Sequence, residues 1–184
     1  MKTIFITGAS RGIGFEMARQ SLSCGNRVIA SCRNPDDADE LNSLMDSYDQ
    51  LDLLEMDVCS NDSVNACLSH LYSKRQPIDL LFNNAGIIDW RNFHEITEDS
   101  FARIYQTNVV GAFLCLRACL PCLRLSGSPL VVNLSSRLGS IDLRGETQLG
   151  GAIAYQCSKS GLNMLTKQAA LDLKALGICV VSLS

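Results

Sequence analysis

Short apolar segments alternate with longer amphipathic segments along the chain, and this alternation restricts the fold more than any other feature. The apolar segments have the length of β-strands and carry hydrophobic residues at consecutive positions, which predicts burial of both strand faces. The longer segments repeat their apolar residues at helical spacing. Strands buried on both faces and separated by helices indicate a parallel sheet that is covered by helices on both sides.

The alternation sets the expected boundaries of each element. The expected strands are Lys2–Thr7, Arg27–Ser31, Leu51–Met56, Ile78–Phe82, Leu130–Leu134 and Ile178–Leu183. The expected helices are Gly12–Cys24, Asp37–Tyr48, Asn61–Ser73, Glu98–Leu125 and Gly151–Leu176. Right-handed crossovers between parallel strands arrange these elements as α/β layers, a doubly wound parallel sheet of the Rossmann type with three αβα layers. With no internal repeat or linker, residues 1–184 are expected to form a single domain.

The composition is that of an ordinary globular protein, with 47% hydrophobic and 19% charged residues. A formal net charge of −3 supplies no positive field that would attract nucleic acid or an anionic membrane surface. The longest uncharged stretch, Ile104–Leu116, falls short of the roughly 18 residues that span a bilayer. The N-terminus lacks the pattern of a signal peptide, so a cytoplasmic location is expected.

Nine cysteines are scattered over the expected strands and helices. Cys119 and Cys122 form a C-x-x-C pair after Cys115 on an apolar helical stretch, without a second Cys/His pair nearby. A metal or redox site is the weaker interpretation of this pair. Small buried side chains in a reducing compartment are the stronger one, and no metal site is predicted.

A glycine-rich turn follows the first expected strand directly, and a helix follows the turn. Gly8 permits a tight turn, Gly12 lets the backbone approach a pyrophosphate, and Gly14 lets the helix pack closely against the strand. The N-terminus of the helix offers free N–H groups and a positive dipole end to phosphates. No Lys-Ser/Thr pair follows the glycines, which disfavours a P-loop. The predicted dinucleotide-binding residues of this turn are Gly8, Ser10, Arg11, Gly12, Ile13 and Gly14.

The end of the second strand indicates which dinucleotide is bound. An NAD-binding protein carries an acidic residue there, roughly 20 residues past the glycines, which binds the ribose 2′-hydroxyl. This chain has Ser31-Cys32-Arg33 instead. Arg33 and Arg11 together suit a 2′-phosphate, since guanidinium groups form charge-assisted hydrogen bonds with phosphate oxygens. NADP(H) is therefore the predicted cofactor, with NAD as the alternative.

Tyr155 and Lys159 stand four residues apart near the start of the last long helix, which places both side chains on one helical face. A free phenol has a pKa of about 10, and a cation fixed beside it favours the phenolate. Such a phenol can protonate a carbonyl oxygen or deprotonate an alcohol. Ser135 and Ser136, at the end of the fifth strand, add hydroxyls that can hold the substrate oxygen.

These residues belong to a set of segments by which the chain resembles the short-chain dehydrogenase/reductase family. The matching segments, in the order of the family, are TGASRGIG (Thr7–Gly14), MDV (Met56–Val58), NNAG (Asn83–Gly86), TNVVG (Thr107–Gly111), VNLSS (Val132–Ser136) and YQCSK (Tyr155–Lys159). Within the family, SCRNP (Ser31–Pro35) and the long stretch between Ser136 and Tyr155 resemble the C-factor or sniffer-like carbonyl reductases.

The resemblance implies roles for the catalytic residues. Ser136, which begins an S-x-x-G that ends at Gly139, is implied to orient the substrate. Tyr155 is implied to be the general acid/base, and Lys159 to lower its pKa and hold the nicotinamide ribose. Asn108 is implied to anchor a water that continues a proton relay from Lys159.

The resemblance also extends the predicted cofactor site. Asp57 and Val58 are implied to meet the adenine, and Asn84, with Ala85 and Gly86, the adenosine ribose side of the pocket. Stabilisation of the central sheet is a second role expected for the NNAG turn.

A small-molecule carbonyl or alcohol is the implied substrate. Ile141–Gly151 is expected to lie over the substrate mouth, and Trp90 and Phe93 to line the pocket wall or to serve loop packing. A homodimer or homotetramer is implied, formed through the helices at Glu98–Leu125 and Gly151–Leu176.

Full-length relatives continue past the sixth strand with a Pro-Gly turn, a helical lid and a seventh strand, which this sequence does not contain. If 184 residues are the whole protein, weak cofactor binding and little turnover are expected, because the site loses a wall that excludes water. Three functions follow: an NADPH-dependent carbonyl reductase, a non-catalytic nucleotide-binding or regulatory protein, and an NAD-linked alcohol dehydrogenase.

Overall fold

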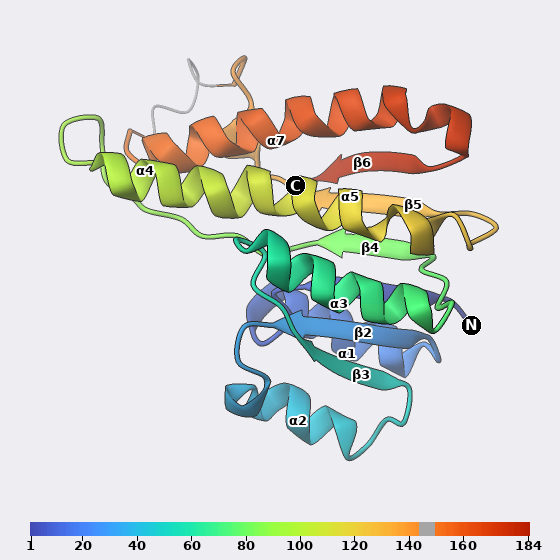
Figure 1. The fold of residues 1–184 in the computed structure, drawn as a ribbon. Helices are drawn as coiled ribbons and strands as arrows, with labels where there is room; N and C mark the ends of the chain where they lie inside the picture. Colours follow the sequence, from blue (N-terminus) through green and yellow to red (C-terminus); the bar gives the residue numbers. More distant parts are fainter. Residues whose placement is uncertain (144–149) are drawn as a thin grey trace.

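A computed structural model describes residues 1–143 and 150–184. Six parallel strands form one sheet in the order β3-β2-β1-β4-β5-β6 (Figure 1). The strands are β1 (Thr3–Thr7), β2 (Arg27–Cys32), β3 (Leu51–Glu55), β4 (Leu80–Asn83), β5 (Leu130–Leu134) and β6 (Cys179–Leu183). This is the strand order of a doubly wound dinucleotide-binding sheet, and the predicted fold class is confirmed.

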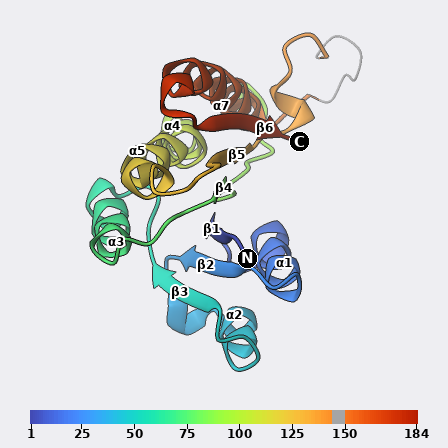
Figure 2. The same cartoon turned by 90° about the vertical axis from the view of Figure 1, so that its right-hand side faces the viewer.

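Helices cover both faces of the sheet, with α1 and α2 on one side and α3, α4, α5 and α7 on the other (Figure 2). Successive strand residues point to opposite faces, so each strand contributes to two cores. In β1, Phe5 joins the core beneath α3 and α5, whereas Ile4 and Ile6 join the core beneath α1. Burial on both sides explains the uninterrupted apolar runs of the strands.

The helices are α1 (Gly12–Ser23), α2 (Asp39–Met45), α3 (Asn61–Ser73), α4 (Glu98–Tyr105), α5 (Gly111–Leu123) and α7 (Ile153–Asp172). Two of them begin later than expected. The expected helix from Asp37 begins later because Pro35 first forms a 3-10 turn, η1 (Pro35–Asp37). The last helix begins at Ile153 rather than Gly151, because Gly151 and Ala152 have φ angles of +84° and +51° that no α-helix contains.

α4 and α5 are joined without a break by η2 (Gln106–Val110), a turn of π-helix. The continuous helix Glu98–Leu123 is long and apolar enough to cross a membrane by length and composition alone. In the fold, 56% of its most apolar window is buried, as in a core helix. Cys115, Cys119 and Cys122 lie on its buried side, which confirms their predicted packing, and burial raises the pKa of the Cys115 thiol to about 12.

The strand order reverses between β1 and β4, which are paired neighbours although α1, β2, α2, β3 and α3 separate them in sequence. In sheets of this kind, the loops beyond the carboxyl ends of the two strands diverge and leave a crevice. The glycine turn follows β1 and the NNAG turn follows β4, so both predicted motifs border that crevice.

Candidate active site

A single cavity of ≈ 1410 Å³ runs along the carboxyl edge of the sheet. It brings together most of the residues predicted from the sequence: Gly8, Ser10, Arg11, Ile13, Arg33, Asp57, Val58, Asn84, Ala85, Gly86, Ser136, Tyr155 and Lys159. Gly12, Gly14 and Asn108 do not line it. Most of the expected dinucleotide-binding and catalytic groups therefore share one space, although they come from the ends of five strands and from α7.

Gly8 makes the turn after β1 because two constraints meet at this residue. Its φ is +64°, a left-handed conformation that side chains disfavour, and a Cβ would lie 2.9 Å from the Cα of Ala85. The side chain of Thr7, the residue before it, accepts the backbone N–H groups of Asn84 and Ala85, both at 3.1 Å. The glycine turn and the NNAG turn are thus held in contact at the switch point, where the strand order reverses between β1 and β4.

Gly14 and Asn84 form the second contact between these turns. The Asn84 amide donates to the carbonyl oxygens of Thr7 at 3.0 Å and Gly8 at 2.9 Å. A Cβ on Gly14 would lie 2.5 Å from Asn84 Nδ2 and 2.6 Å from Gly8 O. Asn84 therefore stabilises the edge of the sheet, which is the second role expected for the NNAG turn. Gly14 has no side chain because Asn84 Nδ2 and Gly8 O occupy the space that a Cβ would need.

We expect Gly14→Ala to lower the free energy of unfolding by about 1–3 kcal/mol, the usual cost of overpacking. The higher helix propensity of alanine, about 1 kcal/mol, cannot offset a contact with backbone atoms that do not move aside. Urea unfolding measures the change. Gly127→Ala is the matched control, because nothing lies within 4 Å of its Cβ position. Equal stability of the two variants would contradict the assigned role of Gly14.

Arg11 and Arg33 lie together beyond the ends of β1 and β2, where the adenosine of a dinucleotide is predicted to bind. Both line the main cavity and also a smaller adjoining hollow of ≈ 690 Å³, which Ser10, Cys32 and Asn34 line as well. Three acidic residues, Asp37, Asp39 and Glu40, complete the lining of that hollow. The sequence predicted that Arg11 and Arg33 act together, and in the fold both line the same two cavities.

Lys159 is the buried cation of the site, 4% exposed. Its Nζ donates to the carbonyl oxygen of Leu134 at 2.6 Å and lies 5.5 Å from the centre of the Tyr155 ring. Burial lowers the pKa of Lys159 from 10.5 to about 8. The phenol and the ammonium group share one helical face in the cavity, as their spacing predicted.

Asn108 sits in the π-turn η2, a distortion that recurs at functional sites. Its Oδ1 accepts the N–H of Ile87 at 2.8 Å, and its Nδ2 donates to Ile87 O and to Ser158 Oγ, each at 2.9 Å. The Cβ position of Gly86 lies 3.3 Å from Asn108 Oδ1 and 3.7 Å from Lys159 Nζ, so both side chains flank this glycine. The Asn108 side chain anchors the loop after β4 to α7; its role in a water relay stays a prediction.

Ser136 is the N-cap of a short 3-10 turn, η3 (Arg137–Gly139), where its Oγ accepts the N–H of Leu138 at 3.1 Å. This turn packs directly on α7, because a Cβ on Gly139 would lie 2.7 Å from the carbonyl carbon of Lys159. The S-x-x-G spacing therefore has a structural cause: the glycine brings the serine turn against the helix that carries Tyr155 and Lys159.

Asp57 and Val58 border the cavity after β3. The Asp57 carboxylate accepts the N–H of Cys59 at 2.9 Å, which shapes the turn before α3. Val58 packs against the helix at Gly111, whose Cβ position lies 3.1 Å from the Val58 side chain. The sequence thus predicted Asp57 and Val58 at the border of the cavity, and the close packing of Val58 requires that residue 111 be glycine.

The cavity also has residues that the sequence did not single out: Ile87, Ile88, Asp89, Arg103, Arg137, Leu138 and Ser184. Their position in the sequence could have identified them, since most lie in loops that follow a strand, or in a helix that follows such a loop. Of the two alternatives for Trp90 and Phe93, the pocket wall is wrong, because their side chains are 67% and 74% exposed and neither residue lines the cavity. Of the expected cover Ile141–Gly151, Leu143 lines the cavity, and residues 144–149 lie outside the described part.

Solved structures of two carbonyl reductases share this fold. The NADPH-bound carbonyl reductase from chicken fatty liver has a TM-score of 0.94 and 31% identity, over 99% of this chain and 78% of that one. The carbonyl reductase Sniffer of Drosophila melanogaster has a TM-score of 0.91 and 32% identity, over 99% and 79%. The predicted resemblance to sniffer-like reductases is confirmed.

Curated relatives are longer than this chain. The oxidoreductase YxbG of Bacillus subtilis is 32% identical, over 100% of this chain and 65% of its own length. The oxidoreductase C663.09c of Schizosaccharomyces pombe is 32% identical, over 94% of this chain and 68% of its own length. The chain thus spans about two thirds of the relatives' length. A family model described as short chain dehydrogenase matches residues 2–184. The chain belongs to the short-chain dehydrogenase family.

Proposed function

We propose that the protein is an oxidoreductase that reduces a ketone or aldehyde to an alcohol with NADPH. The observation that carries the proposal is the shared cavity, in which Ser136, Tyr155 and Lys159 border the same space as the glycine turn. A general acid, a cation and an orienting hydroxyl lie beside the dinucleotide cradle, by which we mean the glycine turn Gly8–Gly14 and the N-terminus of α1. This arrangement suits hydride transfer to a carbonyl. The similarity to two carbonyl reductases supports this reaction class.

Each residue has a distinct part in the proposed reaction. Tyr155 donates the proton of its hydroxyl to the carbonyl oxygen as negative charge develops there. Lys159, held by Leu134 O, keeps a positive charge near the phenol, which favours release of that proton. Ser136 donates a hydrogen bond that orients the substrate oxygen. The dinucleotide, when bound, supplies the hydride.

The residues of the cradle fit a dinucleotide. The Cβ positions of Gly8 and Gly14 are filled by the neighbouring turn, whereas the Cβ position of Gly12 has nothing within 4 Å. The backbone there is open to a close approach by phosphate, next to the N-terminus of α1. Gly8, Ser10, Arg11, Gly12 and Ile13 would hold the pyrophosphate side, and Asp57, Val58, Asn84, Ala85 and Gly86 the adenosine side.

Arg33 is the residue that we expect to distinguish NADPH from NADH. Arg33→Ser removes one of two cations beside the proposed 2′-phosphate, and a lost charge-assisted hydrogen bond of about 1.5–3 kcal/mol corresponds to a tenfold or larger rise in the Kd for NADPH. The Kd for NADH should not change. Nicotinamide fluorescence titration measures both. Arg124→Ser is the control, because Arg124 is an exposed arginine at the end of α5 and lines neither cavity. A parallel loss for both cofactors would contradict the assignment.

The reaction itself is tested by following NADPH oxidation at 340 nm with a panel of ketones and aldehydes. Turnover of at least one carbonyl supports the proposal. NADPH binding without turnover would favour a non-catalytic nucleotide-binding protein. Tighter binding of NAD than NADP, unaffected by Arg33→Asp, would favour an NAD-linked alcohol dehydrogenase.

A homodimer or homotetramer is proposed with the helices α4, α5 and α7 at the contact. These helices carry exposed apolar side chains, among them Phe113, Met164 and Leu171. Burial of such side chains against a second copy is a common reason for their exposure in one chain. Analytical ultracentrifugation tests the assembly, and the cytoplasmic location stays a prediction.

A further inference from the structure

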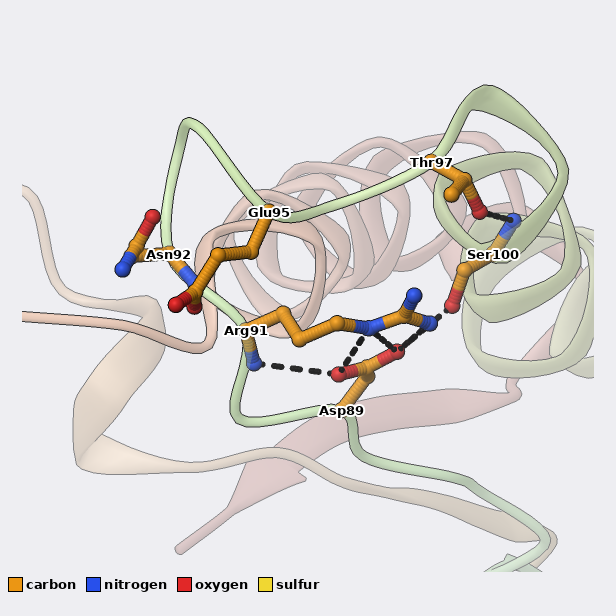
Figure 3. Close-up of polar contacts among 6 residues, drawn as sticks. All are labelled: Asp89, Arg91, Asn92, Glu95, Thr97 and Ser100. Atoms are coloured by element: carbon orange, nitrogen blue, oxygen red, sulfur yellow. Dashed lines mark hydrogen bonds and ion pairs between the residues drawn. The ribbon is translucent and has the colours of Figure 1, made fainter.

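An ion pair outside the proposed catalytic set, Asp89–Arg91, has one of its two members in the lining of the cavity. Asp89, in the loop between β4 and α4, lines the cavity and accepts three donors of Arg91. The Arg91 backbone N–H lies 3.0 Å from Asp89 Oδ1 and Nε lies 2.9 Å from Oδ2, while Nη2 also donates to Oδ2 (Figure 3). The Asp89 side chain is only 16% exposed, against 41% for Arg91. A bidentate pair of this kind fixes orientation as well as charge.

Ser100 connects this pair to α4. Its hydroxyl donates to Asp89 Oδ2 at 2.7 Å, and its backbone N–H donates to Thr97, the N-cap of the helix, at 3.2 Å (Figure 3). The hydrogen bonds from Arg91 and Ser100 hold the pKa of Asp89 well below its usual range. The carboxylate is therefore charged at every pH at which the enzyme would work, and the loop is tied to the first turn of α4.

Trp90, between the two charged residues, connects the loop to the start of α7. Its carbonyl oxygen accepts the N–H of Ala152 at 3.1 Å, and a Cβ on Gly151 would lie 2.6 Å from the same oxygen. Ala152 is the N-cap of α7, with a left-handed backbone and no side-chain cap. Because Tyr155 lies less than one turn further on, the position of the Trp90 peptide bears on the position of the phenol.

The loop has a second attachment at Ile87, whose N–H and C=O groups are both bound by Asn108. Asn108 also binds Ser158 of α7. The loop from Ile87 to Arg91 is therefore fixed to η2 at one end and to α4 and the start of α7 at the other.

We infer that Asp89 is a positioning residue for Tyr155. Its carboxylate, held by Arg91 and Ser100, fixes the Trp90 carbonyl against the Ala152 amide, and this contact sets where the first turn of α7 presents the phenol. Asp89 does not act on the substrate in this role. The inference rests on the proposed function in one respect, that Tyr155 is the general acid.

Kinetics of Asp89→Ala test the effect on the reaction. We expect kcat for carbonyl reduction to fall by tenfold to a hundredfold, because small misplacement of a reacting group is costly, with the Kd for NADPH unchanged. In a Tyr155→Phe background the same change should cause no further loss, since its effect passes through the phenol. An equal loss in both backgrounds, or an unchanged kcat, would overturn the inference.

Two further variants make the kinetic result specific. Asp52→Asn breaks the comparable Arg27–Asp52 pair between β2 and β3, at the opposite end of the strands, and should leave kcat unchanged. Asp89→Asn keeps one side-chain oxygen, which can accept either the Arg91 N–H or the Ser100 hydroxyl but not both, so it should lose less activity than Asp89→Ala. If Asp89→Ala does not fold, Asp89→Asn carries the comparison by itself.

Hydrogen exchange tests the structural link without any turnover. The Ala152 amide should exchange at least tenfold faster in Asp89→Ala than in the unchanged chain, and at an unchanged rate in Asp52→Asn. The Leu173 amide, which donates to Ala169 O at 2.9 Å at the far end of α7, should be unaffected. Unchanged exchange at Ala152 overturns the inference even if the protein reduces no carbonyl, a result that would count separately against the proposed function.

Discussion

Tyr155→Phe should lower kcat/KM for NADPH-dependent carbonyl reduction by about 10²–10⁴-fold, the usual contribution of a general acid. The substitution removes one oxygen and keeps the ring that stands 5.5 Å from Lys159 Nζ. The fold and the cradle, which depends on Gly8, Gly14 and Asn84, stay intact, so the Kd for NADPH should not change. Initial rates on the best carbonyl of the panel, together with a fluorescence titration of NADPH, measure the two quantities.

Tyr105→Phe is the matched control for this prediction. Tyr105 also contacts α7, since its hydroxyl lies 2.7 Å from the Cβ position of Gly161, but it does not line the cavity. Loss of that hydroxyl should leave kcat/KM unchanged. Wild-type rates in Tyr155→Phe would show that another group supplies the proton.

The second large effect concerns stability at alkaline pH. The pKa of Lys159 is about 8 in the folded chain and 10.5 when the side chain is in water. Between these values the unfolded chain binds the extra proton, so the contribution of Lys159 to stability rises with pH, is complete above the unfolded value, and is lost as pH falls through about 8. A difference of this size corresponds to about 3 kcal/mol.

The measurement is urea unfolding of the unchanged chain and of Lys159→Met between about pH 7 and 10. We expect the stability of the unchanged chain to rise relative to the variant across this range. The comparison must be made as a difference, because burial also raises the pKa of Cys67 to about 11, and buried thiols lower the stability of both proteins at high pH. Parallel curves would mean that Lys159 is not held in a desolvated site.

Much of the fold was predictable because its signals are local. Each strand is buried on both faces, so a run such as Thr3–Thr7 indicates a covered parallel strand without knowledge of its neighbours. The errors came where local backbone geometry overrides a pattern. Gly151 and Ala152 delay the last helix, and Pro35 delays the second, because their conformations interrupt an otherwise helical spacing.

The candidate site was predictable in the same measure. The glycine turn and the Tyr155–Lys159 spacing are local patterns, so each could be recognised within its own short segment of the sequence. Asp89 and Arg103 were missed because nothing near them in sequence marks them as cavity residues. The pocket-wall alternative for Trp90 was wrong because its backbone carbonyl, and not its exposed ring, contacts the start of α7.

The sequence by itself determined the element order, the glycine turn, the charge at the end of β2 and the pairing of a phenol with a lysine on one helical face. Tertiary structure decided what these parts share. It brought Thr7 and Asn84 into hydrogen-bonding contact and packed Gly139 against the backbone of Lys159. It also placed the Trp90 carbonyl where it accepts the Ala152 N–H. Each of these contacts links residues distant in sequence, and a contact of that kind depends on how β-strands and helices pack, which no local pattern encodes.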